Sequence, residues 1–444
     1  MNKEFHKKQN FFSFSDIDSE RKDRIMKFTS TEATPAPHVP PGVLRLTGAA
    51  KEDIPMYRIQ TMNKISPVGL NRFPSELYEV GDAVQDPQGI LVRSAKLLDL
   101  EFNPGLLAIA RAGVGVNNIP LDRCAAAGIP VFSTPGANAN AVKELVICAM
   151  LMGSRDIPGA IRWVREQAAS GVDVSTVVEK GKSAFIGPEL YKKTLGIIGL
   201  GAIGSIVANT AISLGMDVYG YDPFLSVDTA LRLDRHVHVV KDINDLYKRS
   251  DYITMHIHYT EKTAHMIDAS AIAAMKRGVR VINLARGEIV DDEAMLTALN
   301  PGMLTAYITH FPNNRLLTPP HVSAMPHLGA STPESEQNCA AMAVDTLRDY
   351  LESGNIRSSV NLPEMTMDRS GVQRLCVLHK NVPGMLANIT SLFGRDGVNV
   401  ENLSNKSRGD YAYTMVDLGS KVGDNVIEDV RRTANVIRVR SLEW

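Results

Sequence analysis

The sequence predicts an α/β protein in which two doubly wound parallel-sheet, Rossmann-like domains precede a C-terminal ferredoxin-like domain. Short apolar runs, which predict buried strands, alternate with helical segments from residue 56 to residue 351, and this alternation is typical of parallel sheets built from βαβ units. Residues 371–444 instead show the order βαββαβ, which is typical of a ferredoxin-like layout. A chain of 444 residues is too long for one hydrophobic core, so about two to four domains are expected.

The bulk composition is that of an ordinary globular protein, with 44% apolar residues, 22% charged residues and a formal charge of -1. This charge gives no attraction to nucleic acid or to an anionic membrane, so neither is an expected partner. The longest apolar helical stretch, residues 145–152, is too short to span a bilayer. The four cysteines have no metal-ligand spacing and predict reduced thiols in a cytoplasmic protein without a bound metal.

The predicted elements follow a first segment, residues 1–55, whose mixed charges and Thr-, Ala- and Pro-rich composition predict a disordered extension. Strands are expected over residues 57–61, 89–92, 106–110, 131–132, 195–198, 216–221, 252–256, 279–283 and 304–308. Helices are expected over residues 139–152, 205–214 and 333–351. In the C-terminal part, strands are expected at 374–379, 398–403, 411–418 and 436–442, and helices at 383–393 and 426–433.

The most specific motif is Gly199-x-Gly201-x-x-Gly204, which lies between an apolar strand and a helix. The first glycine allows a tight turn, the second lets the backbone approach a pyrophosphate, and the third lets helix and strand pack closely. Asp222 ends the next strand, where a carboxylate can bind the ribose hydroxyls and would repel a 2′-phosphate, which favours NAD over NADP. The structural alternative is a glycine-rich turn of any α/β sheet. The expected cofactor-binding residues are Gly199, Gly201, Ala202, Ile203, Gly204 and Asp222.

Two residues near predicted strand ends could act on a carboxylate-bearing alcohol. Arg286 follows the strand at 279–283, and strand carboxyl ends face the ligand crevice of an open α/β sheet. Its guanidinium could hold a carboxylate through two parallel hydrogen bonds, although a surface arginine in a salt bridge is the alternative. His327 lies on a short loop before a helix, and an imidazole suits proton exchange with an alcohol. A lone loop histidine is more often structural, but beside Arg286 and a dinucleotide site a catalytic role is favoured.

Groups that could bind anions are expected at two further strand ends. The glycine-rich loop at residues 111–118 could offer backbone N–H groups to an anion. Arg93 follows the strand at 89–92 and could hold a second anionic group such as a phosphate, with a solvated surface charge as the alternative. The expected substrate-binding residues are Arg93, Ser94, Gly113, Val114 and Gly115.

In combination these motifs resemble those of the D-2-hydroxyacid dehydrogenases, and most closely the phosphoglycerate dehydrogenase branch of that family. The resemblance implies a substrate domain in two segments, residues 56–134 and 330–355, with an NAD-binding domain at residues 135–329 between them. It implies NAD-dependent oxidation of 3-phospho-D-glycerate to 3-phosphohydroxypyruvate, the first step of L-serine biosynthesis, by a homodimer or homotetramer. It also implies that His256 lines the nicotinamide side of the cleft.

The segment from residue 371 to residue 444, after a linker at residues 356–370, resembles an ACT domain, a regulatory module that binds amino acids. The resemblance implies an effector, L-serine, bound by His379 and Asn381 together with Asn399 of the partner subunit. An ACT unit that serves only for dimerisation is the alternative.

One position departs from the family pattern. The family pairs its histidine with a glutamate, which orients the imidazole and favours its protonated form. Counting from Phe311-Pro312 places Asn314 at that position. An amide can accept a hydrogen bond from the imidazole but cannot supply a negative charge. Three outcomes are therefore open: a less well supported His327, a replacement of the acid by Glu334 from the following helix, or a loss of catalysis.

Two other histidines have no place in the family pattern. His310 stands close to the expected acid position, but it is neutral or cationic and does not replace a carboxylate. His258 has no role that the pattern assigns. For the chain as a whole, the alternatives to a phosphoglycerate dehydrogenase are a dehydrogenase for another D-2-hydroxyacid and a catalytically weak NAD-sensing scaffold.

Overall fold

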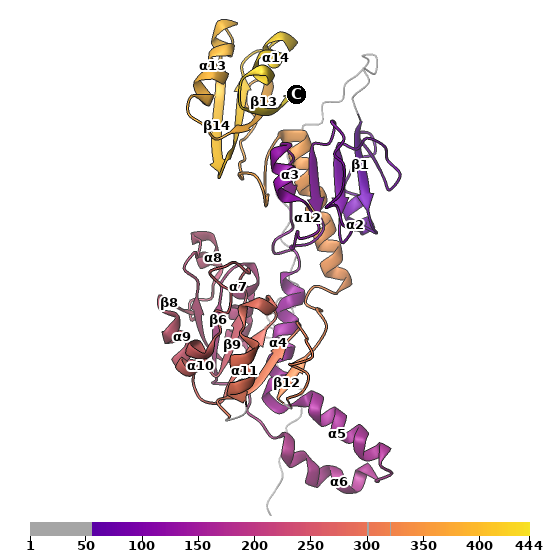
Figure 1. Cartoon of the computed structure of the whole chain (residues 1–444), viewed down its shortest axis with the longest axis vertical. Helices are drawn as coiled ribbons and strands as arrows, with labels where there is room; N and C mark the ends of the chain where they lie inside the picture. The colour runs from indigo at the N-terminus through magenta and orange to yellow at the C-terminus, as the bar shows by residue number, and fades with distance from the viewer. Residues whose placement is uncertain (1–55, 300–301, 320) are drawn as a thin grey trace, which may run out of the picture. The chain divides into compact units, whose positions relative to one another are not determined.

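The computed structural model describes residues 56–299, 302–319 and 321–444. The predicted disordered extension at residues 1–55 lies outside the described residues. The described part contains two parallel sheets and one antiparallel sheet, which confirms the predicted α/β class with Rossmann-like parallel sheets (Figure 1). None of the described helices combines the length and the apolar character that a membrane crossing requires.

The first sheet contains five parallel strands in the order β2-β1-β3-β4-β5. Neighbouring strand residues face opposite sides, so Leu91 packs in the core that includes α12, whereas Ile90 packs in the core that includes Cys124 of α3. The long helix α12 thereby joins two segments that are far apart in the sequence. The elements are β1 Tyr57–Met62, α2 Pro67–Leu70, β2 Tyr78–Gly81, β3 Gly89–Val92, β4 Ala108–Arg111, α3 Leu121–Ala126, β5 Val131–Phe132 and α12 Pro333–Ser353.

The second sheet contains seven parallel strands in the order β12-β11-β10-β9-β6-β7-β8. Ile197 faces the core that includes α4 and α7, whereas Ile198 faces the core that includes α9, α10 and α11, so this sheet is covered on both faces. The strands are β6 Thr194–Ile198, β7 Asp217–Tyr221, β8 His238–Val240, β9 Tyr252–Met255, β10 Val279–Asn283, β11 Leu304–Thr309 and β12 Val322–Ala324. The helices are α4 Ala139–Arg155, α7 Ala202–Ser213, α8 Val227–Arg232, α9 Ile243–Arg249, α10 Ala269–Ala274 and α11 Asp292–Leu299.

Two helices that the sequence analysis did not predict follow α4: α5 Ile157–Ala169 and α6 Val174–Gly181 (Figure 1). Each begins with an aspartate N-cap. The Asp156 side chain accepts a hydrogen bond from the Gly159 N–H, and the Asp173 side chain accepts one from the Ser175 N–H. A proline in the first turn of α5 adds a second helix-start signal. These capping signals could have identified both helices.

The C-terminal segment folds as β13 Gln373–Lys380, α13 Met385–Arg395, β14 Val400–Arg408, β15 Tyr411–Leu418, α14 Asp424–Arg432 and β16 Val436–Glu443. Its antiparallel sheet has the order β14-β15-β13-β16. One face packs against α13 and α14. Residues of the other face, including Leu378 and Met415, belong to the same core as Leu347 of α12. The C-terminal sheet is therefore packed directly against the first parallel sheet and its helix.

Polar side chains of the C-terminal segment form hydrogen bonds with the end of α12 at this contact. Arg440 donates hydrogen bonds to the Tyr350 and Leu351 carbonyls, and Tyr413 donates one of 2.6 Å to the Gly354 carbonyl. The Tyr350 carbonyl also accepts the Gly354 N–H, and the Leu351 carbonyl also accepts the Tyr57 hydroxyl, so Arg440 adds a second donor to each of these carbonyls at the helix end. The fully buried Arg374 binds Asp417 through two hydrogen bonds of 2.5 and 2.7 Å.

Candidate active site

Three neighbouring strands bring the candidate catalytic residues to one edge of the seven-stranded sheet. Arg286 follows β10, His310 follows β11 immediately, and His327 follows β12. The strands are parallel and in register, with Asn283 paired to Thr309 and Thr309 paired to Ala324. Parallel strands end at the same sheet edge, where open α/β sheets bind their ligands.

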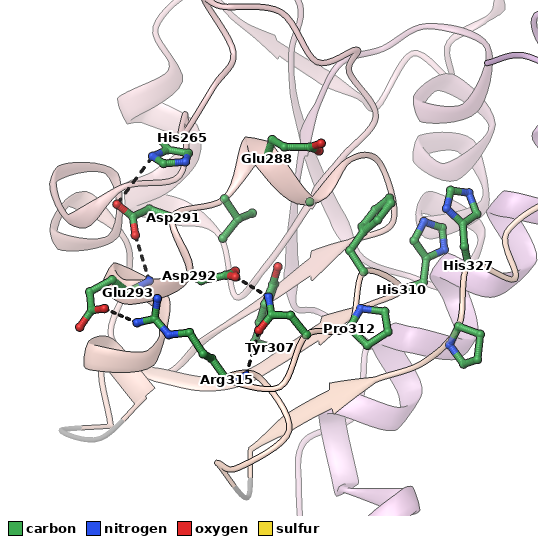
Figure 2. Close-up of a pocket in the computed structure, with 15 residues that line it drawn as sticks. His265, Glu288, Asp291, Asp292, Glu293, Tyr307, His310, Pro312, Arg315 and His327 are labelled. Carbon is green, nitrogen blue, oxygen red and sulfur yellow. Dashed lines mark hydrogen bonds and ion pairs between the residues drawn. The ribbon is translucent and has the colours of Figure 1, made fainter. Parts of the chain in front are cut away.

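The imidazole rings of His310 and His327 are stacked, with ring centroids 4.1 Å apart and an interplanar angle of 18° (Figure 2). Phe311 places its ring edge-on to both, at 4.5 Å from the centroid of His310 and 5.2 Å from that of His327. His310 is only 2% exposed, whereas His327 is exposed. Neither nitrogen of His310 has a hydrogen-bond partner among the described residues.

Both histidines favour the neutral form in this setting. Burial lowers the pKa of His327, and the positive charge of Arg286 lowers it further. Burial also lowers the pKa of His310 to about 4, with added contributions from His327 and Arg286. Removing a charged form from water and placing it near another cation both disfavour protonation. The pair therefore differs from a histidine beside a carboxylate, where protonation is favoured.

Asn314, which the sequence analysis placed at the acid position, is exposed and does not line the pocket that contains His327. Glu334, the other candidate, is exposed in the first turn of α12. The residue in contact with the His327 ring is instead His310, because it directly follows β11 while Asn314 lies farther along the loop. Of the three outcomes left open, this arrangement favours a His327 without a carboxylate partner, and the effect on catalysis stays a prediction. The signal for His310 was its position directly after a predicted strand.

The pocket beside this pair has a volume of about 710 Å³ (Figure 2). At its other end, ion pairs and hydrogen bonds occupy the acidic side chains: Arg315 with Glu293, Asn313 with Asp292, and His265 near Asp291 at 3.9 Å. It is lined by His265, Gly287, Glu288, Val290, Asp291, Asp292, Glu293, Tyr307, His310, Phe311, Pro312, Asn313, Arg315, Pro326 and His327. No group of three or more His, Cys, Asp or Glu within the described ranges could hold a metal ion.

Two guanidinium groups approach the glycine-rich loop. A Cβ added to Gly115 would lie 3.7 Å from Nη2 of Arg286 and 3.9 Å from Nη1 of Arg111. Burial lowers the pKa of Arg111, and the nearby charges of Arg286 and Arg93 lower it further. In the part of the chain that the structure describes, neither Arg111 nor Arg286 forms an ion pair. Arg111 had no role assigned from the sequence beyond the start of the loop, yet a half-buried arginine without a carboxylate partner is suited to an anionic ligand.

Arg93 is engaged differently from the prediction. Its guanidinium binds Glu336 of α12 at 2.5 Å, and both side chains are 43% exposed. Its backbone carbonyl accepts a hydrogen bond from Nε of Arg111 at 3.0 Å. The Ser94 N–H donates to Asn63, so the strand end is fixed from both sides. A phosphate at Arg93 would have to compete with Glu336.

At the cofactor motif the residues fit a dinucleotide. Gly199 has a φ of +91°, which favours glycine, and a Cβ on Gly204 would lie 1.9 Å from the Gly199 carbonyl oxygen. A Cβ on Gly201 would meet nothing within 4 Å, so the backbone there is open to a ligand. Helix α7 starts directly behind it with no side chain capping its N–H groups. Ala202 and Ile203 form its first turn, where anions are favoured.

Asp222 and His256 flank this motif. The Asp222 carboxylate accepts hydrogen bonds from the Leu200 and Phe224 N–H groups, each 2.9 Å long, which fixes it at the end of β7. His256 follows β9, and burial lowers its pKa to about 4, so its ring is neutral. Its Nε2 lies 3.2 Å from the Thr254 hydroxyl. Exposed His258 has no side-chain interaction with this site in the described residues.

Two polar residues near the loop were missed by the sequence analysis. The Thr134 hydroxyl and the Asn138 side-chain oxygen are buried without a hydrogen-bond partner in the described residues. The Thr134 N–H donates to the Gly113 carbonyl at 3.1 Å, and the nearby Gly136 approaches Ala202 of α7. The segment therefore lies between the substrate loop and the cofactor motif. Because buried polar atoms normally find partners, these two are candidates for ligand contacts.

The C-terminal effector residues are not equally available. His379 is 2% exposed, and both of its ring nitrogens are engaged, Nδ1 with the Lys380 carbonyl at 2.8 Å and Nε2 with the Thr414 hydroxyl at 2.9 Å. Its ring is turned into the sheet, and its contact with an effector stays a prediction. Asn381 donates to the Gly409 carbonyl, and exposed Asn399 donates to Glu401. Those two residues stay predictions.

Comparison with known proteins identifies the family. Residues 147–329 match the model of the D-isomer specific 2-hydroxyacid dehydrogenase NAD-binding domain. The chain therefore belongs to the D-isomer-specific 2-hydroxyacid dehydrogenases, and the matched domain agrees with NAD as the predicted cofactor. Within that class the chain is similar to D-3-phosphoglycerate dehydrogenases. The relative from Haemophilus influenzae is 31% identical over 379 residues, which cover 82% of this chain and 88% of that protein.

Other relatives extend beyond the region that aligns with this chain. The D-3-phosphoglycerate dehydrogenase from Synechocystis is 36% identical, with 71% of this chain and 56% of that protein covered, so the chain spans just over half of its length. Among solved structures, NAD+-bound 3-phosphoglycerate dehydrogenase from Entamoeba histolytica is 26% identical with a TM-score of 0.53 and covers 69% of this chain and 99% of that one. D-Mandelate dehydrogenase from Rhodotorula graminis, at 21% identity and a TM-score of 0.59 over 71% of this chain and 100% of that one, shows the same fold.

Proposed function

We propose that this chain is an NAD-dependent dehydrogenase that oxidises 3-phospho-D-glycerate to 3-phosphohydroxypyruvate, the first step of L-serine biosynthesis. The observation that carries the proposal is that Arg286 and His327 follow β10 and β12 at one edge of the sheet, where Arg286 approaches the glycine loop and the same sheet carries the dinucleotide motif. The relatives named D-3-phosphoglycerate dehydrogenase support the choice of substrate.

Arg286 and Arg111 would hold the substrate carboxylate against the backbone of residues 113–115, since both guanidinium groups approach Gly115. His327 would take the proton of the C2 hydroxyl as the C2–O bond becomes a carbonyl. The charge of Arg286 would stabilise the negative charge that develops on that oxygen. Gly201 and Asp222 would hold NAD+, which would supply the acceptor for the hydride from C2.

The electrostatics of His327 suit this direction of reaction. A base must be neutral before it accepts a proton, and burial together with Arg286 lowers the pKa of His327. The neutral base therefore persists to lower pH than for a histidine paired with a carboxylate. A carboxylate partner is not required for proton acceptance, although its absence leaves the imidazolium that forms less stabilised.

A second candidate is a dehydrogenase for a D-2-hydroxyacid without a phosphate. The observation that favours it is the Arg93–Glu336 ion pair, which already occupies the guanidinium assigned to the phosphate. A catalytically weak NAD-sensing scaffold is the third candidate, supported by the exposed position of Asn314. Arg286 and His327 together argue against it.

The C-terminal domain supports a regulatory role. Its βαββαβ order and its sheet order fit a ferredoxin-like ACT domain, for which we propose L-serine as effector through Asn381 and, across a subunit interface, Asn399. The direct packing of its sheet against the core of α12 offers a physical route from an effector to the substrate domain. A homodimer or homotetramer would provide the interface.

The first experiment measures NADH formation from 3-phospho-D-glycerate and NAD+, with a product trap, for the full chain and for His327→Ala. We expect turnover in the first and a fall of about 100- to 10,000-fold in the second. Glu336→Gln separates the first two candidates, because freeing Arg93 should lower KM for 3-phospho-D-glycerate but not for D-lactate. Turnover that is unchanged in His327→Ala would refute the assigned mechanism. No turnover on either acid, with NAD+ binding intact, would favour the scaffold.

A further inference from the structure

His327 lacks the contact that would ordinarily fix its ring. In the described residues no side chain or backbone group forms a hydrogen bond with its imidazole, and its ring contacts are those with His310 and Phe311. A base that serves a defined hydroxyl needs a defined ring orientation, because proton transfer requires a short and well-aligned hydrogen bond. The orientation of His327 must therefore come from packing.

His310 supplies a rigid surface for that packing. It directly follows β11, is 2% exposed, and lies so close to Gly329 that a Cβ added there would be 3.2 Å from Cε1 of His310. Phe311 is held in turn against Gly287, with 3.3 Å between an added Cβ there and Cβ of Phe311. A chain of contacts thus connects the residue after Arg286 to the face of the His327 ring.

We propose that His310 is a positioning residue for His327: its buried ring, stacked face to face on the catalytic imidazole, sets the plane in which that base meets the substrate hydroxyl. Packing takes the place that a hydrogen-bonded carboxylate would otherwise have. Because His327 is catalytic only if the proposed dehydrogenase function holds, this role rests on that function.

The charges around the pair are compatible with this role. Arg286 is the cation that acts on both rings, and it lowers the pKa of each after burial. Glu288 from the turn after Arg286 lines the same pocket, as do His265, Asp291, Asp292, Glu293 and Arg315. With its pKa near 4, His310 stays neutral while His327 gains a proton. A neutral aromatic face can stack on the resulting imidazolium without repulsion.

Two substitutions distinguish the contribution of the His310 aromatic ring from that of its nitrogen atoms. His310→Phe keeps an aromatic face and removes the nitrogens, whereas His310→Asn keeps a polar group and removes the ring. An aromatic stack favours one arrangement by about 2- to 10-fold. We therefore expect kcat for oxidation to fall by about 3- to 10-fold in His310→Asn, with KM unchanged, and to stay within about 2-fold in His310→Phe. His265→Asn, at the far end of the same pocket, is the matched control and should not change kcat.

A measurement that does not depend on turnover can test the positioning role of His310 separately from the proposed dehydrogenase function. The Cε1 proton of His327 should show an upfield ring-current shift in the NMR spectrum of the unaltered chain and of His310→Phe, and this shift should disappear in His310→Asn. Its absence in the unaltered chain would overturn the stacked arrangement even if a variant fails to fold. Equal loss of kcat in both variants, retention in His310→Asn alone, or unchanged kcat in both would overturn the positioning role. An inactive chain with the expected shifts would contradict the dehydrogenase function instead.

Discussion

The seven-stranded sheet has two candidate ligand sites at the carboxyl ends of its strands, and the two sites are held in place in different ways. At β6 and β7 the cofactor motif is fixed by backbone geometry: Gly204 packs so closely on Gly199 that no Cβ fits. At β11 and β12 the proposed proton-transfer site depends on a contact between side chains, because the His310 and His327 rings stack from the loops that follow these two strands. Backbone constraints can be recognised from residue type and spacing, whereas a contact between loop side chains depends on loop paths that spacing alone does not define.

Apart from His327→Ala, the largest effect is expected at the side-chain end, from Arg286→Lys. Lysine keeps the charge but cannot form two parallel hydrogen bonds to a carboxylate. We expect kcat/KM for the hydroxyacid to fall by about 100- to 1,000-fold, while calorimetry should show unchanged NAD+ binding. Arg315→Lys is the matched control, since Arg315 lines the same pocket but is paired with Glu293. An equal fall in both variants would show that the pocket, and not the guanidinium geometry, is being perturbed.

The same contrast explains how much the sequence predicts. The strands were predictable because their apolar residues alternate between two buried faces, as Ile197 and Ile198 do. The cofactor residues were predictable because few other arrangements need three glycines and an acid at that spacing. Helices α5 and α6 were missed because their start signals are single caps, Asp156 and Asp173, rather than an apolar pattern.

The site residues were less predictable for a different reason. Counting from Phe311-Pro312 gave Asn314, but the ring that reaches His327 comes from His310 at the strand end. Arg93 was predicted to hold a substrate anion or to be a solvated surface charge, yet Glu336 from the distant helix α12 pairs with it. His379 stays a predicted effector ligand, but its hydrogen bond to Thr414 inside the sheet was not visible in the sequence. In each case a tertiary contact, invisible to spacing, decides what the side chain can bind.

An effect of intermediate size is expected on the pH dependence of the free energy of unfolding, and it arises from His310. The pKa of His310 is about 4 in the folded chain and 6.5 without burial. The unfolded chain therefore binds more protons between these values, so the free energy of unfolding falls as pH drops from 6.5 toward 4. We expect His310→Phe to abolish about 3 kcal/mol of this loss. Urea unfolding of both proteins at neutral pH and near pH 4 measures it, and the pKa shift of His256 cancels because both carry it. Parallel losses in the two proteins would contradict a neutral, buried His310.

The smallest effect is expected at the cofactor motif, where two glycine substitutions distinguish a glycine needed for ligand approach from one needed for packing. A methyl group on Gly201 meets nothing within 4 Å, so Gly201→Ala should leave the free energy of unfolding nearly unchanged. It should nevertheless raise the Kd for NAD+ by about 10-fold, because the methyl group would occupy the space that the pyrophosphate needs. Gly204→Ala is the contrast: its Cβ would lie 1.9 Å from the Gly199 carbonyl oxygen, so unfolding measurements should show a loss of about 1–3 kcal/mol. If Gly201→Ala binds NAD+ normally, the open space at that glycine does not hold the cofactor. If Gly201→Ala destabilises the chain as much as Gly204→Ala does, both glycines are required for packing. The glycine at position 201 would then be no evidence for a bound dinucleotide.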